Sequence, residues 1–364
     1  MKRLLALSVM IALTGAGCQM KPPAPTLPST SSRQVVGTTD NVTTIAINDQ
    51  PNYYIDYGLR FITPTSTKIE SRILLVPHHF LPVRQIGEAF ATAPDAKRII
   101  LISPDHFSGC RTAVCTTGAN FTYDQLQIST TPANADFIEK RDSVFTREHG
   151  IRGLLPFVAT RWPDAQITPL TIRADAATSS IDELTYWVTQ QLQDKNTYLV
   201  TTIDLSHYLP AYLADIHDRV TIRDLLSIDP ERWQTMEIDN PPIARITLAV
   251  ARELGLKGTL LSHTNSLRLA QSWSIREGTS HAIIQYGLNG QEPENVTTTL
   301  YTDPSRMIAS PENRYYWGFD RVVTTTTKQD WAIIETSTGT QIIPLPVIRQ
   351  GDSFLPVTDA DYPR

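Results

Sequence analysis

The sequence is poor in several features that would assign a protein to a class at once. Only 3 of its 364 residues are cysteines, which excludes a disulfide-rich scaffold, and their spacing matches no zinc finger. Acidic residues (37) outnumber basic ones (32), and a net charge of −5 argues against a nucleic-acid partner. No Gly-x-Ser-x-Gly elbow is present, which argues against a Ser-His-Asp hydrolase. The chain has instead an ordinary globular composition and is long enough for one large domain, or for one domain with an appendage.

The N-terminus has the pattern of an export signal. Lys2-Arg3 precedes an apolar run of about ten residues, Leu4–Leu13, which is too short to span a bilayer. Small residues and then Cys18 follow, and residues 1–18 together resemble a bacterial lipoprotein signal peptide that is lipidated at Cys18. The alternative is an ordinary cleaved signal peptide in which Cys18 is incidental.

The lipoprotein interpretation predicts a lipid-anchored protein of the bacterial cell envelope. Residues 19–40 begin with a stretch rich in Pro, Ser and Thr, which predicts a flexible tether. Gln19 favours the outer membrane, by the habit of such signals, with the protein on the periplasmic side. The other two cysteines, Cys110 and Cys115, either form a disulfide in that oxidising compartment or are two small, half-buried residues.

Four short apolar runs organise the rest of the chain, and each of them stops at a histidine. Runs of this length rich in Ile, Leu and Val predict strands that are buried on both faces of a helix-covered sheet. Ligands of open α/β sheets bind beyond the carboxyl ends of the strands. Five of the 8 histidines lie at these predicted strand ends: His78, His79, His106, His207 and His263.

Strand and helix patterns alternate over residues 71–287, which predicts an α/β fold with a mixed, mostly parallel central sheet flanked by helices. We assign this domain to residues 41–288 and a β-rich C-terminal appendage to residues 289–364. We also expect a strand over Tyr53–Ile62 and a helix over Asp136–Phe145. Pro156 should kink or stop the helix that begins at Glu148-His149.

The histidines suggest a metal site. Neutral imidazole is the commonest protein ligand for iron, copper and zinc, and two histidines with one carboxylate form the site of non-haem Fe(II) oxygenases. The carboxylates within reach in the sequence are Asp105, Asp204, Glu237 and Asp239, and spacing alone does not choose among them.

Five short motifs, in this order, resemble the Memo-like family, which includes the AmmeMemoRadiSam system protein B. The resemblance implies a fold similar to the class III, LigB-type extradiol dioxygenases over about residues 73–287. The motifs are Pro77-His78, Ile102–His106, Glu148-His149 with Leu155–Phe157, Asp204–Tyr208, and Pro242-Ile243.

The resemblance implies roles for several of these residues. The two metal-ligand histidines of the family fall on His78 and His106. Asp204 and His207 match an Asp-x-x-His pair that lines the pocket, with His207 as the candidate acid/base. His149 would lie close by.

The third ligand departs from the family pattern. It is a cysteine in Memo-like proteins and a glutamate in the dioxygenases, but here Ile238 occupies the position. If the alignment with the family is shifted by one residue, Glu237 or Asp239 becomes the third ligand. Without such a shift, the site has lost its third ligand. His79 replaces a small residue of the family, and either substitutes as a ligand or walls the pocket. Asp105 is a further candidate ligand.

Two functions follow from this pattern. The first is a metal-dependent redox enzyme of the dioxygenase type, with Fe(II), O₂ and an electron-rich small-molecule substrate. The second is a non-catalytic accessory protein that binds a metal ion or small ligand, for which copper suits the histidines as well as iron. The run that ends at His263 matches no motif of the family, and we interpret that histidine as structural.

Overall fold

The computed structural model describes the α/β domain and four strands of the C-terminal segment. The described residues are 38–39, 42–47, 52–63, 69–209, 211–270, 278–289, 331–336, 339–344, 347–350 and 353–356. The predicted signal peptide with Cys18 lies outside them, as does the predicted tether except for Thr38–Thr39. Within the described residues no helix has both the length and the apolar character needed to cross a bilayer.

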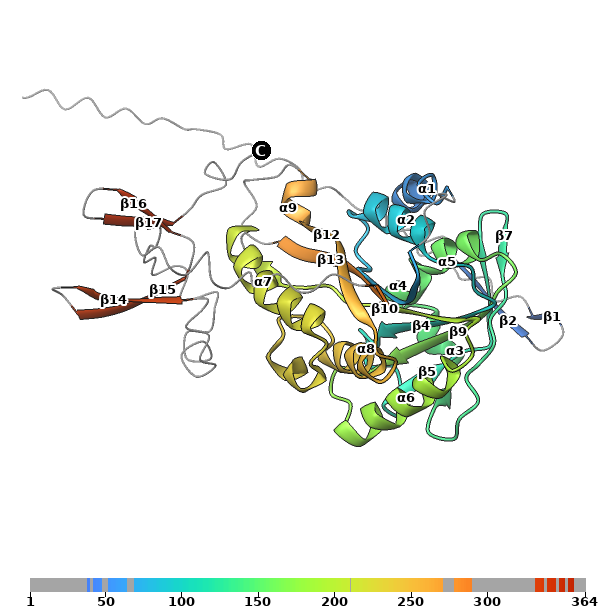
Figure 1. The fold of residues 1–364 in the computed structure, drawn as a ribbon. Helices are drawn as coiled ribbons and strands as arrows, with labels where there is room; N and C mark the ends of the chain where they lie inside the picture. The colour runs from blue at the N-terminus through green and yellow to red at the C-terminus, as the bar shows by residue number, and fades with distance from the viewer. Residues whose placement is uncertain are drawn as a thin grey trace, which may run out of the picture. The chain divides into compact units, whose positions relative to one another are not determined.

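A nine-stranded mixed sheet forms the centre of the domain (Figure 1). Four neighbouring strands, in the spatial order β3, β10, β4, β9, run parallel. The remaining strands complete the edges, where β13 pairs antiparallel with β3, and β5 antiparallel with β9. The bounds are β3 Ser71–Val76, β4 Arg98–Pro104, β5 Val114–Thr116, β8 Glu139–Lys140, β9 Gln166–Ile172, β10 Thr197–Thr202, β11 His207–Leu209, β12 Lys257–Asn265 and β13 Gly278–Gly287.

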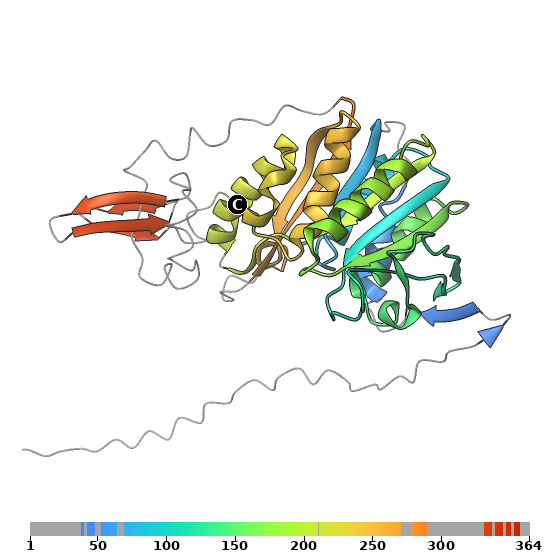
Figure 2. The ribbon, with the colours of Figure 1, turned by 90° about the horizontal axis from the view of Figure 1, so that it is seen from below.

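Helices cover both faces of this sheet, because alternate residues of each central strand point to opposite sides. Leu74 and Leu101 join a core with α1 (Asn52–Leu59), α2 (Val83–Thr92), α4 (His149–Arg152) and α5 (Leu155–Arg161). Leu75 and Ile102 join a second core with α6 (Thr178–Gln191), α7 (Ala211–Ser227) and α8 (Pro241–Glu253), which lie side by side in Figure 2. The predicted fold class is therefore confirmed.

Shorter elements surround the two layers. A four-stranded sheet contains β1 (Thr38–Thr39), β2 (Val42–Ala46), β6 (Asn120–Tyr123) and β7 (Leu126–Ile128), so Thr38–Thr39 of the predicted tether is a strand. The connections include α3 (Asp142–Phe145), the 3₁₀ helix η1 (Pro230–Thr235) and α9 (Ser266–Leu269). In the predicted β-rich appendage, β14 (Trp331–Thr336) pairs with β15 (Gly339–Pro344), and β16 (Val347–Gln350) with β17 (Ser353–Pro356).

Two element predictions are wrong. The predicted strand over Tyr53–Ile62 is mostly helix α1, because Ile55 and Gly58 fall on one helical face and pack against neighbouring helices. The predicted helix over Asp136–Phe145 is instead the short strand β8 followed by α3, since β8 completes the sheet by pairing with β5. The helix predicted from Glu148-His149 is interrupted, as expected: α4 ends at Arg152, and α5 begins at Leu155 with Pro156 in its first turn.

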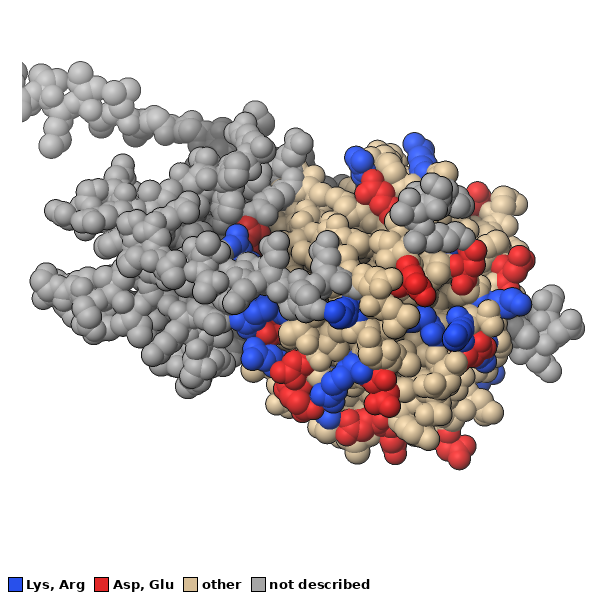
Figure 3. Space-filling view, viewed as in Figure 1, with Lys and Arg blue, Asp and Glu red and all other residues tan. Residues whose placement is uncertain are grey.

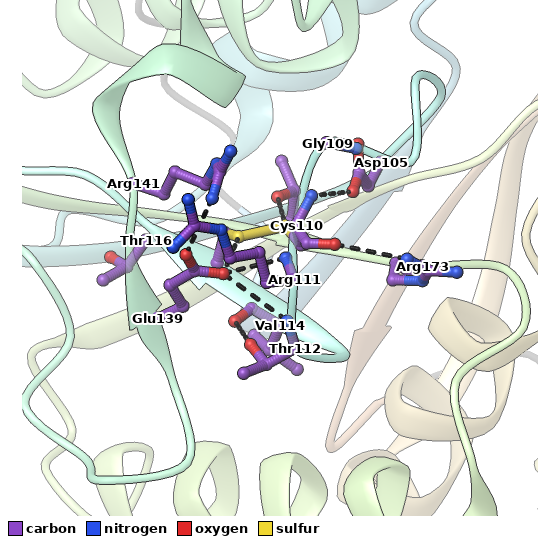
Figure 4. The surroundings of a disulfide bond; sticks show 12 residues. Asp105, Gly109, Cys110, Arg111, Thr112, Val114, Thr116, Glu139, Arg141 and Arg173 are labelled. Atoms are coloured by element: carbon purple, nitrogen blue, oxygen red, sulfur yellow. Dashed lines mark hydrogen bonds and ion pairs between the residues drawn. A yellow bond between two sulfur atoms is a disulfide. The ribbon is translucent and has the colours of Figure 1, made fainter.

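Cys110 and Cys115 form a disulfide, which decides between the two alternatives left open by the sequence (Figure 4). Both residues are buried. The bonded segment is held from two sides. The Glu139 carboxylate accepts a hydrogen bond from the backbone N–H of Arg111, and the Asp105 carboxylate accepts one from the backbone N–H of Cys110. The disulfide thus fixes the loop that follows His106.

Candidate metal centre

The carboxyl ends of three adjacent parallel strands bring the first side chains of the site together. His78 follows β3, Asp204 follows β10 and His106 follows β4. Since β10 lies between β3 and β4, the three residues meet at one edge of the sheet. The ring centroids of His78 and His106 are 4.7 Å apart, and His78 Nε2 lies 3.4 Å from Asp204 Oδ2.

Asp239 supplies a second carboxylate from the loop between η1 and α8. Its Oδ2 lies 3.2 Å from His78 Nε2 and 3.6 Å from His106 Nε2. Two backbone contacts fix the loop, because the Asp239 N–H donates to the Asp204 carbonyl oxygen and the Asp204 N–H donates to Asp239 Oδ1. The side chain of Asn240 caps α8 and donates to the Ile172 carbonyl oxygen at the end of β9. Asp239 is therefore placed by the strand ends themselves.

A second layer of polar groups orients both histidines. His78 Nδ1 lies 3.1 Å from Thr202 Oγ1, and His106 Nδ1 lies 2.7 Å from Glu148 Oε1. Glu148 is fully buried and also accepts hydrogen bonds from the backbone N–H groups of His106 and Gly150. Partners at Nδ1 leave Nε2 of each ring directed at Asp239, which is how metal-binding histidines are commonly supported.

His149 adds a third imidazole, at the first residue of α4. Its ring centroid lies 4.1 Å from that of His106 and 5.3 Å from that of His78. One ligand atom from each of the three rings lies within 4.8 Å of the other two, so the group could hold a metal ion. Burial, together with the positive charge of the other two rings, lowers the pKa of His149 to about 4. This ring is therefore neutral at pH 7.

The site favours positive charge. Burial alone would lower the pKa of His78, but Asp204 and Asp239 outweigh it and raise that pKa. Burial likewise opposes the charged form of His106, yet the neighbouring carboxylates of Asp239 and Glu148 raise its pKa to about 9. Asp239 Oδ2 is buried and has no well-aligned hydrogen-bond donor among the described residues. A metal cation would coordinate this oxygen and would replace the protons that the raised pKa values place on His78 and His106. The residues present therefore suit a metal ion.

A cavity of about 310 Å³ opens beside the centre. Its walls combine aromatic and apolar side chains with the polar groups of the site. The residues that line it are Tyr54, His78, His79, Phe80, Leu81, His149 and Asp204. A small molecule that enters here would contact the His78 and His149 rings, and this is the arrangement expected of a ligand site.

Three residues predicted as candidates lie away from the centre and its cavity, and a fourth, His79, forms part of the cavity wall, which is one of its two predicted roles. The Glu237 carboxylate lies 3.7 Å from His217 Nδ1, and Asp105 accepts hydrogen bonds from the backbone of the loop after His106. His79 lines the cavity and packs against His281, with 4.8 Å between ring centroids. His207 Nδ1 donates to the Leu205 carbonyl oxygen, and this residue is not among the described residues that line the cavity.

Three supporting residues were not predicted. They are Glu148, Thr202 and His281, whose Nδ1 lies 3.2 Å from Asp204 Oδ1. Glu148 was visible in the Glu-His motif, but nothing in the sequence shows that its carboxylate turns back to His106. Thr202 ends a buried strand, and His281 lies inside one, so neither has a local signal.

Comparison with known proteins gives a consistent family. A family model described as Memo-like protein matches residues 49–275. A MEMO1 family protein of Nitrosopumilus maritimus is 21% identical over 183 residues, which cover 46% of this chain and 66% of that protein. A MEMO1 family protein of Pyrobaculum aerophilum is 24% identical over 184 residues, with 46% and 65% covered. The chain thus spans just under two thirds of the length of these curated relatives.

The similarity to solved structures is weaker. An uncharacterized protein from Escherichia coli K12 superposes with a TM-score of 0.36 and 12% identity, over 59% of this chain and 100% of that chain. The predicted similarity to the extradiol dioxygenases stays a prediction.

Proposed function

Because the chain belongs to the Memo-like protein family, we propose that His78, His106 and Asp239 bind one Fe(II) ion for a redox reaction on a small molecule. One observation carries the proposal. Asp239 Oδ2 is a buried carboxylate oxygen that lacks an aligned donor and faces the Nε2 atoms of both histidines. Two imidazoles and one carboxylate are the donor set of non-haem Fe(II) oxygenases.

The identity of the metal is argued from the donor atoms. Thiolates select soft ions such as Cu(I), whereas carboxylates suit harder ions. The Memo-like resemblance implies a cysteine as third ligand, but in this chain Cys110 and Cys115 are bonded to each other and Asp239 stands at the centre. This substitution favours Fe(II) over copper.

The cavity residues would bind and orient the substrate. Tyr54 and Phe80 provide aromatic walls that suit a flat, electron-rich molecule such as a catechol. Asp204 stays ionised, because the positive charge of His78 and the hydrogen bond from His281 outweigh burial and lower its pKa. His149 is neutral at pH 7 and lines the cavity, so it can accept a proton from a substrate hydroxyl. Bound Fe(II) would supply Lewis acidity and one-electron chemistry beside these groups.

Metal analysis of protein purified without a His tag tests this function. After anaerobic reconstitution we expect about one equivalent of iron at this centre, lost in the His78→Ala/His106→Ala double variant. Asp239→Asn should lose it as well. Glu237→Gln is the matched control and should retain it, because Glu237 contacts His217 instead. Oxygen uptake with catechols then tests for an enzyme. Protein that takes up no iron at these residues would contradict the proposal.

A second candidate function rests on His149. With His78 and His106 it forms a set of three imidazoles, which suits copper in a non-catalytic metal-binding protein. The two candidates differ in which variant loses the metal. His149→Ala would abolish binding in the copper protein but would leave iron bound by His78, His106 and Asp239.

We also propose that the protein is tethered to the bacterial envelope by a lipid on Cys18, which the signal-like residues 1–18 support. Cys18→Ser should move the protein from the detergent phase to the aqueous phase and abolish labelling with a fatty acid. Gln19→Asp should keep the lipid but retain the protein in the inner membrane. Unchanged partitioning of Cys18→Ser would contradict the tether.

A further inference from the structure

A second group of metal-binding side chains lies beneath helix α7, and it shares no residue with the centre described above. Asp215 and Asp218 come from α7, which packs on β12 and β13, and His263 comes from β12. One ligand atom from each of the three lies within 4.8 Å of the other two. Asp218 is fully buried and Asp215 is 7% exposed. Figure 2 shows α7 alongside these strands.

The contacts of Asp218 hold the group together. Its Oδ2 lies 2.8 Å from His263 Nε2, and its Oδ1 accepts a hydrogen bond of 2.8 Å from Ser206 Oγ. The sequence alone predicts a structural role for His263. However, two buried carboxylates close to one imidazole together present the oxygen and nitrogen donors that bind divalent cations.

An independent observation points to a ligand at the same place. Ser280 on β13 is fully buried, and its Oγ has no hydrogen-bond partner among the described residues. Ser280 lies on the same face of β13 as Ala282 and Tyr286, which follow it by two and six residues. The Tyr286 hydroxyl donates to the Leu225 carbonyl oxygen of α7. The Ser280 side chain therefore faces α7. Its backbone N–H also donates to the carbonyl oxygen of Ser206, the residue whose hydroxyl reaches Asp218.

We propose that Asp215, Asp218 and His263 bind a second divalent cation of the zinc or manganese class, with Ser280 Oγ as an additional oxygen donor. One imidazole nitrogen with carboxylate and hydroxyl oxygens is a donor set of intermediate hardness, which suits these ions. The inference does not depend on the proposed function. Through Asp218 and Ser206 the ion would brace the segment between Asp204 and His207 that borders the first centre.

Metal stoichiometry tests the second site separately from the first. After equilibration with Zn²⁺ we expect two equivalents in the wild type. One should remain in His78→Ala/His106→Ala, and one in Asp218→Asn/His263→Gln. If the wild type binds one equivalent that only His78→Ala/His106→Ala loses, the second site is wrong and the first stands. If only Asp218→Asn/His263→Gln loses it, the second site stands and the proposed function fails.

A spectroscopic variant covers the case in which Asp218→Asn/His263→Gln does not fold. Ser280→Cys, made in the His78→Ala/His106→Ala background and loaded with Co²⁺, should place a thiolate on the ion. We expect a thiolate-to-cobalt charge-transfer band that the parent lacks, and a metal-dependent rise in the melting temperature of both proteins. Cobalt that binds without the band would overturn the role of Ser280. A protein that binds no cobalt would overturn the site.

Discussion

At the scale of single residues, the candidate site depends on buried carboxylates and on the groups that donate hydrogen bonds to them. Glu148 shows this best. It is fully buried and accepts hydrogen bonds from the His106 ring, the His106 backbone and the Gly150 backbone. Burial opposes its ionisation, but the bond to His106 outweighs this and lowers the pKa of Glu148. Glu148 is thus a charged group that supports the ring of His106.

We predict that Glu148→Gln weakens metal binding without emptying the site. The amide keeps the shape of the carboxylate but lacks the charge that orients His106, and losing such a partner typically costs about 10–100-fold in metal affinity. Titration with Fe(II) under anaerobic conditions measures the change. Glu88→Gln is the control, because Glu88 lies on the exposed side of α2 and pairs with Arg84. An unchanged affinity in Glu148→Gln would refute the role of Glu148.

The sequence could predict His78 and His106 because each directly follows a buried strand, where the direction of the chain fixes the position of the side chain. It could not choose between Glu237 and Asp239. They lie in an irregular loop before α8, in which the hydrogen bonds of Asp239 to the Asp204 backbone decide which carboxylate turns inward. Those bonds join segments 35 residues apart, and no local pattern encodes them.

At the scale of elements, close packing of helices α1 and α2 sets one wall of the cavity. A Cβ atom added at Gly87 of α2 would collide with the Gly58 carbonyl oxygen of α1, which is backbone and cannot rotate away. Helix α1 carries Tyr54, a residue that lines the cavity. The two glycines therefore allow α1 to approach the site.

We predict that Gly87→Ala destabilises the protein by about 1–3 kcal/mol, as overpacking usually does. Alanine is favoured over glycine in a free helix by about 1 kcal/mol, so a stabilised variant would contradict the packing described here. Chemical denaturation measures the change. Glu88→Ala on the adjacent, exposed position of α2 should lie within about 0.5 kcal/mol of the wild type.

Strand β8 gives a prediction on pH. Burial opposes the charge of Glu139, but hydrogen bonds from the backbone of Arg111 and the side chain of Arg141 outweigh it and lower the pKa of Glu139. A carboxyl whose pKa is lower in the folded state stabilises the fold above its ordinary pKa, and this contribution is lost as the pH falls through the lowered value. Glu139 therefore stabilises the disulfide loop at neutral pH and not in acid.

Glu139→Gln should lower the melting temperature at pH 7 by roughly 2–4 °C, the shift caused by about 1 kcal/mol in a domain of this size. The difference from the wild type should shrink as the pH is lowered, because the wild-type carboxyl is then protonated too. Thermal melts of both proteins from neutral to acidic pH test this. A difference that is constant with pH would show that the charge of Glu139 is not involved.

Among the elements, the buried strands were predictable because a short uninterrupted run of Ile, Leu and Val usually forms a strand that is buried on both faces. Helix α1 was mistaken for a strand because its three exposed tyrosines, Tyr53, Tyr54 and Tyr57, favour strands in general. The packing of Ile55 and Gly58 against other helices overrides that preference. The apolar run before His263 predicts a strand that ends at this residue. Strand β12 instead continues as far as Asn265 and pairs antiparallel with β13.

At the scale of the whole molecule, the two hydrophobic cores define the domain. All their buried members among the described residues lie between Ile45 and Tyr286. We therefore predict that a fragment of residues 41–288 folds without the rest of the chain and melts within a few degrees of the full protein. Circular dichroism and metal content of both proteins test this, and a fragment that aggregates would contradict the boundary.

Neither positive nor negative charge predominates on the face shown in Figure 3, where Lys and Arg side chains are interspersed with Asp and Glu. This agrees with the modest net charge of −5. The absence of a nucleic-acid partner stays a prediction. The candidate metal site lies at the carboxyl edge of the sheet, where three parallel strands and one loop converge.

The most direct test of the central claim is an anomalous difference map, recorded at the iron absorption edge from crystals of the protein loaded anaerobically with Fe(II). We predict a peak at the ends of β3, β10 and β4, bonded to His78 Nε2, His106 Nε2 and Asp239 Oδ2. A map without a peak there would contradict the claim, and so would a peak bonded to His78, His106 and His149 with Asp239 turned away.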